Sequence, residues 1–143
     1  MAKLFINKDI APDSDKAKYW LSGEDSISFT DIQYFMDWMD RNDNRIDVEI
    51  HSCGGDCVEG YAIYDALRAS GKEISCKVVD TCASMATVIL LAAPLERRTA
   101  YAHSSLCIHD PYGDGALLKW KVTPKRLESV AADLRAEKQK MLE

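Results

Sequence analysis

Four residues in one region of this sequence could together carry out acyl transfer. Two adjacent glycines, Gly54 and Gly55, are followed by Ser84, which lies 30 residues after Gly54, and by His109, which lies 25 residues after Ser84. In acyl transfer a serine hydroxyl attacks a carbonyl carbon, an imidazole accepts the hydroxyl proton, and backbone N–H groups stabilise the developing oxyanion. A glycine turn can supply such N–H groups, so the sequence contains an amide-rich turn, a nucleophile and a base.

Each of these residues also has an ordinary structural explanation. Ser84 lies between a strand-like run and an apolar helix-like run, a position where serine commonly acts as a helix N-cap. A Gly-Gly pair by itself indicates only a turn. A single histidine at the end of a strand is more often structural, and His51 and His103 lie outside this set of four residues. The presence of all four residues together, rather than any one of them, favours the catalytic interpretation.

An alternation of strands and helices must position these residues. Residues 45–51 alternate between apolar and polar side chains, which predicts a strand ending just before the glycines. Residues 84–93 are apolar on all sides, which predicts a buried helix. The remaining pattern predicts strands at 3–6, 74–79, 98–102 and 106–109, and a helix at 58–70 that Gly71 ends. This alternation predicts an α/β domain.

Other signals predict the secondary structure of the N-terminal and C-terminal parts of the chain. Residues 7–26 are polar and are expected to form a loop. Thr30 and Gln33 have the spacing of a capping box, which predicts that a helix begins there, with Ile32, Phe35, Met36 and Met39 on its apolar face. Thr123 and Pro124 predict the start of a last helix. Its apolar stripe consists of Leu127, Val130, Ala131 and Leu134.

The strings around the candidate residues resemble those of the Clp peptidase family, the ClpP-like caseinolytic serine proteases. Residues 51–56 (His-Ser-Cys-Gly-Gly-Asp) are similar to that family's S-P-G-G string, residues 82–85 (Cys-Ala-Ser-Met) to its A-S-M string, and residues 107–111 (Cys-Ile-His-Asp-Pro) to its I-H-x-P string. Residues 60–65 also resemble its first catalytic-region helix. The resemblance covers about residues 46 to 115, and the N-terminal part is similar to the bacteriophage branch, the head maturation (prohead) proteases.

This resemblance implies a fold and a set of roles. The fold would be a ClpP/crotonase-like spiral of β-β-α units, forming a single domain over residues 1–143. Ser84 would be the nucleophile and His109 the general base, with the N–H groups of Gly55 and Met85 as the oxyanion hole. A peptide substrate would pair as an added strand beside the glycine turn and the stretch from Tyr112 to Lys121, so the substrate-binding residues would include Gly54, Asp56 and Tyr112.

The sequence departs from the family pattern at several positions. Cys53 replaces a proline, Ala86 replaces a glycine, and Asp80 replaces a turn glycine, so Asp80 is expected to adopt a conformation that glycine takes freely. The family's catalytic acid lies on a segment later than any in this sequence. We therefore expect the chain to be truncated within the helix that follows His109, and to be nearly inactive as a peptidase by itself. Asp110, Asp114 and Asp80 are the internal alternatives for the acid.

Composition limits the remaining classes of function. The 143 residues, 47% of them hydrophobic, suffice for one core, and a net charge of −5 disfavours nucleic acid as a partner. The longest apolar run, residues 86–94, is too short to span a bilayer, and no signal peptide is evident, so a cytoplasmic protein is expected. The five cysteines are expected to be reduced. His51, Cys53 and Cys57 are too few for structural zinc, and neither metal nor cofactor is expected.

The resemblance implies a serine endopeptidase that processes capsid or scaffold proteins in the host cytoplasm or the phage prohead. Three alternatives remain open. The first is a housekeeping Clp proteolytic subunit fed by an AAA+ unfoldase, the second a non-catalytic ClpP-like assembly subunit, and the third a crotonase-type acyl-CoA enzyme. The apolar stripe of the last helix favours a homo-oligomer, and the resemblance implies a ring.

Overall fold

A computed structural model describes residues 1–112 and 123–143 of the chain, which form two compact units, residues 1–108 and residues 109–143. The strands of the first unit are β1 (Ala2–Ile6), β2 (Asp9–Ile10), β3 (Ser26–Ile27), β4 (Arg45–Ser52), β5 (Glu73–Ala83), β6 (Arg98–Ala100) and β7 (Ser105–Cys107). Its helices are η1 (Asp13–Asp15), α1 (Lys16–Leu21), α2 (Phe29–Trp38), α3 (Cys57–Ala69), α4 (Met85–Leu90) and η2 (Leu95–Arg97). The described part of the second unit contains α5 (Pro124–Leu142).

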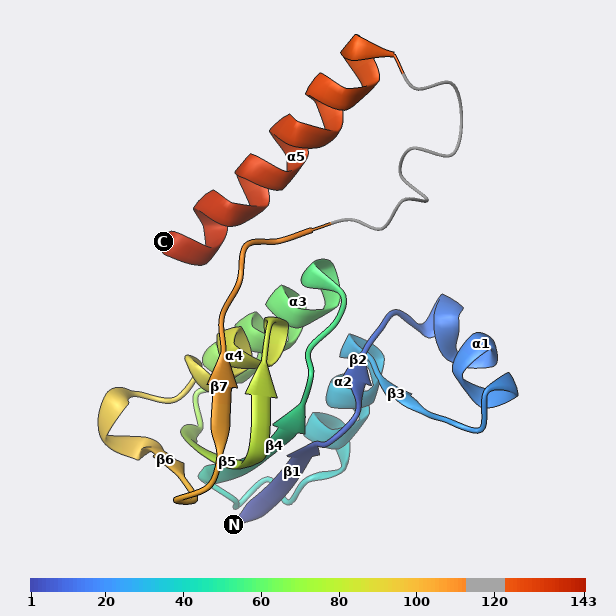
Figure 1. Ribbon diagram of the computed structural model, residues 1–143. Coiled ribbons are helices and arrows are strands. Elements are labelled where there is room, and N and C mark those ends of the chain that lie inside the picture. The colour runs from blue at the N-terminus through green and yellow to red at the C-terminus, as the bar shows by residue number, and fades with distance from the viewer. Residues whose placement is uncertain (113–122) are drawn as a thin grey trace. The chain divides into compact units, whose positions relative to one another are not determined.

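The main sheet of the first unit is parallel, with the strand order β1-β4-β5-β6, and β7 pairs with the last residues of β5 (Figure 1). In a parallel sheet the carboxyl ends of the strands meet at one edge, where loops commonly form ligand and active sites. β4 ends at Ser52 and β5 ends at Ala83, which pairs with Cys107 of β7. The glycine turn and Ser84 therefore both leave the sheet at this edge.

The core lies between the sheet and the helices α3 and α4 (Figure 1). Along β4, Ile46, Val48 and Ile50 are buried and alternate with more exposed polar residues, as the sequence predicted. Gly60 of α3 allows the two helices to approach, because a Cβ built on it would lie 2.5 Å from Cε of Met85. Strands and helices alternate along the chain, so the predicted α/β class is confirmed.

The predicted loop over residues 7–26 is wrong. This segment contains η1, α1 and β2, and β2 pairs in parallel with β3 to form a second, two-stranded sheet. Neither strand is longer than two residues, which is too short for a period-2 pattern to appear in the sequence. The buried side chains of Ile10 and Ile27 attach this small sheet to the core.

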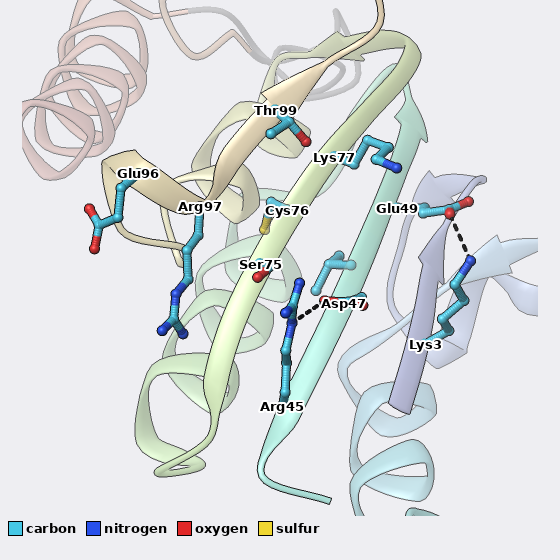
Figure 2. Close-up of a pocket in the computed structure, with 11 residues that line it drawn as sticks. Lys3, Arg45, Asp47, Glu49, Ser75, Cys76, Lys77, Glu96, Arg97 and Thr99 are labelled. Atoms are coloured by element: carbon cyan, nitrogen blue, oxygen red, sulfur yellow. Dashed lines mark hydrogen bonds and ion pairs between the residues drawn. The ribbon is translucent and has the colours of Figure 1, made fainter. Parts of the chain in front are cut away.

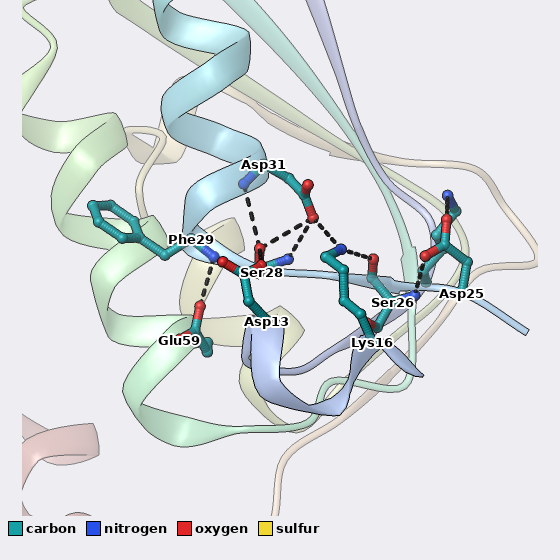
Figure 3. Close-up of polar contacts among 9 residues, drawn as sticks. Asp13, Lys16, Asp25, Ser26, Ser28, Phe29, Asp31 and Glu59 are labelled. Atoms are coloured by element: carbon teal, nitrogen blue, oxygen red, sulfur yellow. Dashed lines mark hydrogen bonds and ion pairs between the residues drawn. The ribbon is translucent and has the colours of Figure 1, made fainter. Parts of the chain in front are cut away.

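The predicted capping box at Thr30 and Gln33 is also wrong, by two residues. Ser28 is the N-cap of α2: its Oγ accepts a hydrogen bond from the Asp31 N–H at 3.3 Å, and Asp31 Oδ2 accepts one from the Ser28 N–H at 2.9 Å. Figure 3 shows that Lys16 and Glu59 complete this cluster. Lys16 Nζ lies 2.7 Å from Asp31 Oδ2, and Glu59 Oε2 accepts from the N–H of Phe29 at 2.6 Å. Three elements, α1, α2 and α3, are thereby joined at the start of α2.

The same cluster predicts a loss of stability in acid. Hydrogen bonds from the hydroxyls of Ser28 and then Thr30 hold the pKa of Asp13 below its usual value. A lowered pKa in the folded state contributes stability that is present above the unfolded pKa and disappears as pH falls through the folded pKa. Replacing Asp13 with Asn should therefore flatten the decline in unfolding free energy below about pH 4. Urea titrations at several pH values measure this.

Asp37 provides a matched control for that experiment. It is an exposed carboxylate of α2, and none of the described residues donates a side-chain hydrogen bond to it. The Asp37→Asn variant should keep the wild-type acid dependence. Equal slopes for the wild type and the Asp13 variant between pH 5 and pH 2 would contradict the assignment.

Several element boundaries differ from the prediction. β5 extends to Ala83 rather than ending at Val79, α4 ends at Leu90, and β7 ends at Cys107, so His109 lies outside the strand. The last helix begins as predicted: Thr123 Oγ1 accepts from the N–H of Arg126 at 3.2 Å. No helix in the described part of the chain combines the length and apolar character needed to cross a membrane.

Candidate active site

The glycine turn after β4 is held in a conformation that requires glycine. Gly54 and Gly55 have φ angles of 91° and 148°, which side-chain-bearing residues rarely adopt. The turn is tied back to the sheet through Ser52, whose Oγ accepts from the Gly54 N–H at 3.1 Å. Asp56, which we expected to contact substrate, is the N-cap of α3 and accepts from the Glu59 N–H at 2.9 Å. Its carboxylate therefore has a structural partner.

Ser84 is in a strained conformation between β5 and α4. Its φ of 54° and ψ of −127° correspond to a turn position that glycine usually occupies, and for another residue such dihedrals cost about 1–3 kcal/mol. The side chain makes no capping hydrogen bond to α4, so the structure does not support the N-cap explanation of this serine. Strained turns of this kind expose the nucleophilic serine of α/β-hydrolases.

The structure brings the glycine turn against the backbone of Ser84. A Cβ built on Gly54 would lie 2.6 Å from the Ala83 carbonyl oxygen, 2.7 Å from the Met85 nitrogen and 2.8 Å from Ser84 Cβ. Among the described residues, no acceptor takes a hydrogen bond from the N–H of Gly55 or Met85. The Met85 N–H therefore lies beside Ser84 where the glycine turn packs, and the N–H of Gly55 belongs to the same turn, so both remain candidates for the predicted oxyanion hole.

Ile10 fixes the orientation of this turn, a role the sequence did not indicate. The Ile10 N–H donates to the Gly54 carbonyl at 2.9 Å, and the Ile10 carbonyl accepts from the Asp56 N–H at 2.8 Å. A Cβ on Gly55 would lie 2.0 Å from the Ile10 oxygen, so the backbones are in direct contact. The bonds are made by the backbone of a residue 44 positions earlier, and no local sequence signal marks them.

Asp80, the aspartate that replaces a family glycine, has the expected unusual backbone. Its φ is 76°, so the expectation from the missing glycine is confirmed. Its Oδ2 lies 3.4 Å from Nδ1 of His51, and its N–H donates to Ser104 Oγ at 3.3 Å. Asp80 was one candidate for the catalytic acid, but its carboxylate already faces a different histidine from the proposed base.

His109 begins the second unit and is described within it. Its Nδ1 lies 2.8 Å from the Asp110 carbonyl oxygen, and its ring is 5.2 Å from that of Tyr112. A carbonyl oxygen can only accept, so this contact is a hydrogen bond when Nδ1 carries the proton, which leaves Nε2 free to accept one. The Asp110 carboxylate, a second candidate acid, instead lies 2.9 Å from Lys138 Nζ.

Part of the predicted site lies outside the described residues. This applies to Asp114, the third candidate acid, and to residues 113–121 of the stretch that was expected to pair with substrate. Tyr112 is described and is exposed. The assignments of Gly54, Asp56 and Tyr112 as substrate-binding residues thus remain predictions.

The cysteines differ in their chemical environments. Burial raises the pKa of Cys76 to about 12 and that of Cys82 to about 11, so neither thiol ionises near neutral pH. Cys53 and Cys107 are exposed, and Cys57 is partly exposed. Within residues 1–112 and 123–143, no group of three or more His, Cys, Asp or Glu side chains could hold a metal ion.

A hollow of about 390 Å³ lies elsewhere, on the sheet face that α3 and α4 do not cover (Figure 2). Its lining is charged but largely paired: Lys3 Nζ lies 3.2 Å from Glu49 Oε1, and Arg45 Nε lies 2.7 Å from Asp47 Oδ1. The first pair joins the adjacent strands β1 and β4, where opposite charges stabilise a solvated sheet face, and the second pair lies within β4. This hollow contains none of the candidate catalytic residues.

The family model and the relatives that match this chain all carry the name of the Clp proteases. The "Clp protease" family matches residues 24–140. The ATP-dependent Clp protease proteolytic subunit of Pleurastrum terricola is 39% identical over 66 residues, which cover 46% of this chain and 34% of that protein. The same-named protein of Porphyromonas gingivalis is 36% identical over 84 residues, covering 57% and 38%. The chain thus matches little more than a third of the length of these relatives.

A solved structure shows the same arrangement of elements. A mutant of ClpP1 from Listeria monocytogenes superposes with a TM-score of 0.68 and covers 97% of this chain and 67% of that protein, at 17% sequence identity. This similarity confirms that the fold is ClpP-like.

Proposed function

The chain belongs to the Clp protease family, and we propose that it is a serine endopeptidase in which Ser84 attacks the carbonyl carbon of a peptide bond. His109 takes the hydroxyl proton through Nε2 and then donates it to the amine that leaves. Water, deprotonated by the same histidine, then attacks the acyl carbon, and the histidine returns this proton to the Ser84 oxygen as the acid product leaves. The N–H groups of Gly55 and Met85 stabilise the oxyanion in both steps.

The observation that carries this proposal is the backbone of Ser84. The φ angle of Ser84 is 54°, its hydroxyl makes no capping hydrogen bond, and a glycine turn packs against it. This strained conformation has no evident structural purpose. Strain of this kind is concentrated at functional sites. The carbonyl of Cys107, the last residue of β7, accepts a hydrogen bond from the Ser84 N–H at 2.8 Å. His109 lies two residues later in the sequence, so the proposed base closely follows the residue that is hydrogen-bonded to the proposed nucleophile.

The names of the relatives bear on the choice between a phage head maturation protease and a subunit that works with an ATPase. Both describe a proteolytic subunit of an ATP-dependent protease, and this favours a subunit that is supplied with substrate by an ATPase over a phage head maturation protease. We propose that the substrates are unfolded proteins and that the protein assembles with copies of itself. The half-exposed Leu127 on the apolar stripe of α5 supports such assembly.

The test of this function is the appearance of new amino termini. Each cut in a polypeptide releases one amine, so incubation with denatured casein should produce amines in proportion to time and protein concentration, at the low rate expected of a serine and a histidine that act without a catalytic acid. A crotonase-type enzyme would instead turn over an acyl-CoA, and an assembly subunit would do neither. Turnover of acyl-CoA without release of amines would contradict the peptidase assignment.

A further inference from the structure

Thr87 is the one polar side chain in an otherwise apolar helix. α4 has the sequence Met-Ala-Thr-Val-Ile-Leu, and Thr87 is only 8% exposed. A buried hydroxyl is costly unless it forms a hydrogen bond. Its described partner is the Ser84 carbonyl oxygen, which accepts from Thr87 Oγ1 at 2.5 Å and from the Thr87 N–H at 3.0 Å.

The Ser84 carbonyl belongs to the same peptide unit as the Met85 N–H. Peptide units are planar, and no peptide bond in the described chain is cis, so the two groups point in opposite directions along one rigid plane. Whatever fixes the carbonyl therefore also fixes the N–H. We propose that Thr87 is a positioning residue whose hydroxyl, through the Ser84 carbonyl, aims the Met85 N–H at the oxyanion. This inference rests on the function proposed above.

The need for such a residue follows from the strain at Ser84. Its dihedrals are those of the first central residue of a type II′ turn, where glycine is usual. On one side the Ser84 N–H is fixed by the Cys107 carbonyl at 2.8 Å, and on the other the carbonyl is fixed by Thr87. A threonine commonly hydrogen-bonds to a carbonyl one turn earlier in a helix. Here that carbonyl is the one attached to the proposed nucleophile.

Loss of the Thr87 hydroxyl should slow the reaction of Ser84 with a probe. Oxyanion donors are effective only at about 2.7–3.1 Å from the developing charge, so a tilt of the Met85 peptide weakens one of two donors. We expect Thr87→Val, which keeps the shape but removes the hydroxyl, to lower the maximal rate of Ser84 phosphonylation about tenfold, a fraction of the 100- to 1000-fold loss of a whole donor. The half-saturating probe concentration should not change. Thr87→Ser, which keeps the hydroxyl, should react within about twofold of the wild-type rate.

The experiment measures phosphonylation by a small alkyl fluorophosphonate at increasing concentrations, for the wild type and for both variants. Thr99→Val is the matched control, because Thr99 is exposed on β6 away from the glycine turn. Thermal unfolding of each variant establishes that it is folded. A valine variant as fast as the wild type, or a serine variant as slow as the valine variant, would overturn the proposal.

A second measurement does not depend on catalysis. The residual dipolar coupling of the Met85 N–H reports the direction of that bond, and it should change in Thr87→Val and return to the wild-type value in Thr87→Ser. An unchanged coupling in the valine variant would contradict the proposal even in a chain with no activity. If instead the coupling changes but the wild type is never labelled at Ser84, the peptidase function is wrong and the positioning geometry is right.

Discussion

Replacement of Ser84 by alanine should abolish peptide hydrolysis while leaving the fold intact. Without the hydroxyl no acyl-enzyme can form, and removal of the nucleophile from a well-studied serine protease lowers turnover by about a million-fold. The fold should persist because the Ser84 side chain makes no capping hydrogen bond. The release of amines from denatured casein measures the rate, and circular dichroism measures the fold.

Ser22→Ala is the control for this variant. Ser22 is an exposed serine at the end of α1, and its Oγ bonds only to the Lys18 carbonyl among the described residues. This variant should cleave at the wild-type rate. Residual cleavage by Ser84→Ala above the uncatalysed background would show that another group is the nucleophile.

Replacement of His109 by alanine should slow hydrolysis by about 100- to 10,000-fold, the range that general acid–base catalysis contributes. The carbonyl contact at Nδ1 leaves Nε2 as the free acceptor, and no other group in the proposal can take the serine proton. Added imidazole should partly restore the rate, because it can enter the space that the side chain vacates. Casein cleavage with and without imidazole measures both effects.

His103→Ala is the matched control, since His103 is exposed and lies outside the motif that contains His109. It should keep the full rate and show no response to imidazole. A His109 variant as active as the wild type would exclude this residue as the base.

The sequence predicted the sheet edge of this site well because the signals there are local. The alternation of Ile46, Val48 and Ile50 is set by burial of one strand face, and the structure confirms it. The unusual backbone of Asp80 followed from a missing glycine and is also confirmed, with a φ of 76°. Such features depend on a residue and its immediate neighbours, so they can be recognised in one chain.

Other features depend on contacts between distant segments and could not be predicted. Ile10 orients the glycine turn through its backbone, and any residue except proline could make the same two hydrogen bonds. The two-residue strands β2 and β3 exist only because they pair with each other. The start of α2 was misplaced because Ser28 and Thr30 are both good N-caps, and it is the reciprocal hydrogen bonds between Ser28 and Asp31 that decide between them.

The most direct test of the central claim is to identify the residue that a fluorophosphonate labels. Trypsin cleaves after Lys77 and Arg97, and Ser84 is the only serine in the resulting peptide, residues 78–97. Tandem mass spectrometry should find one phosphonyl group per chain, in this peptide and on Ser84, in the folded protein but not after denaturation. Labelling of any other residue, or no labelling of the folded chain, would contradict the assignment of Ser84 as an activated nucleophile.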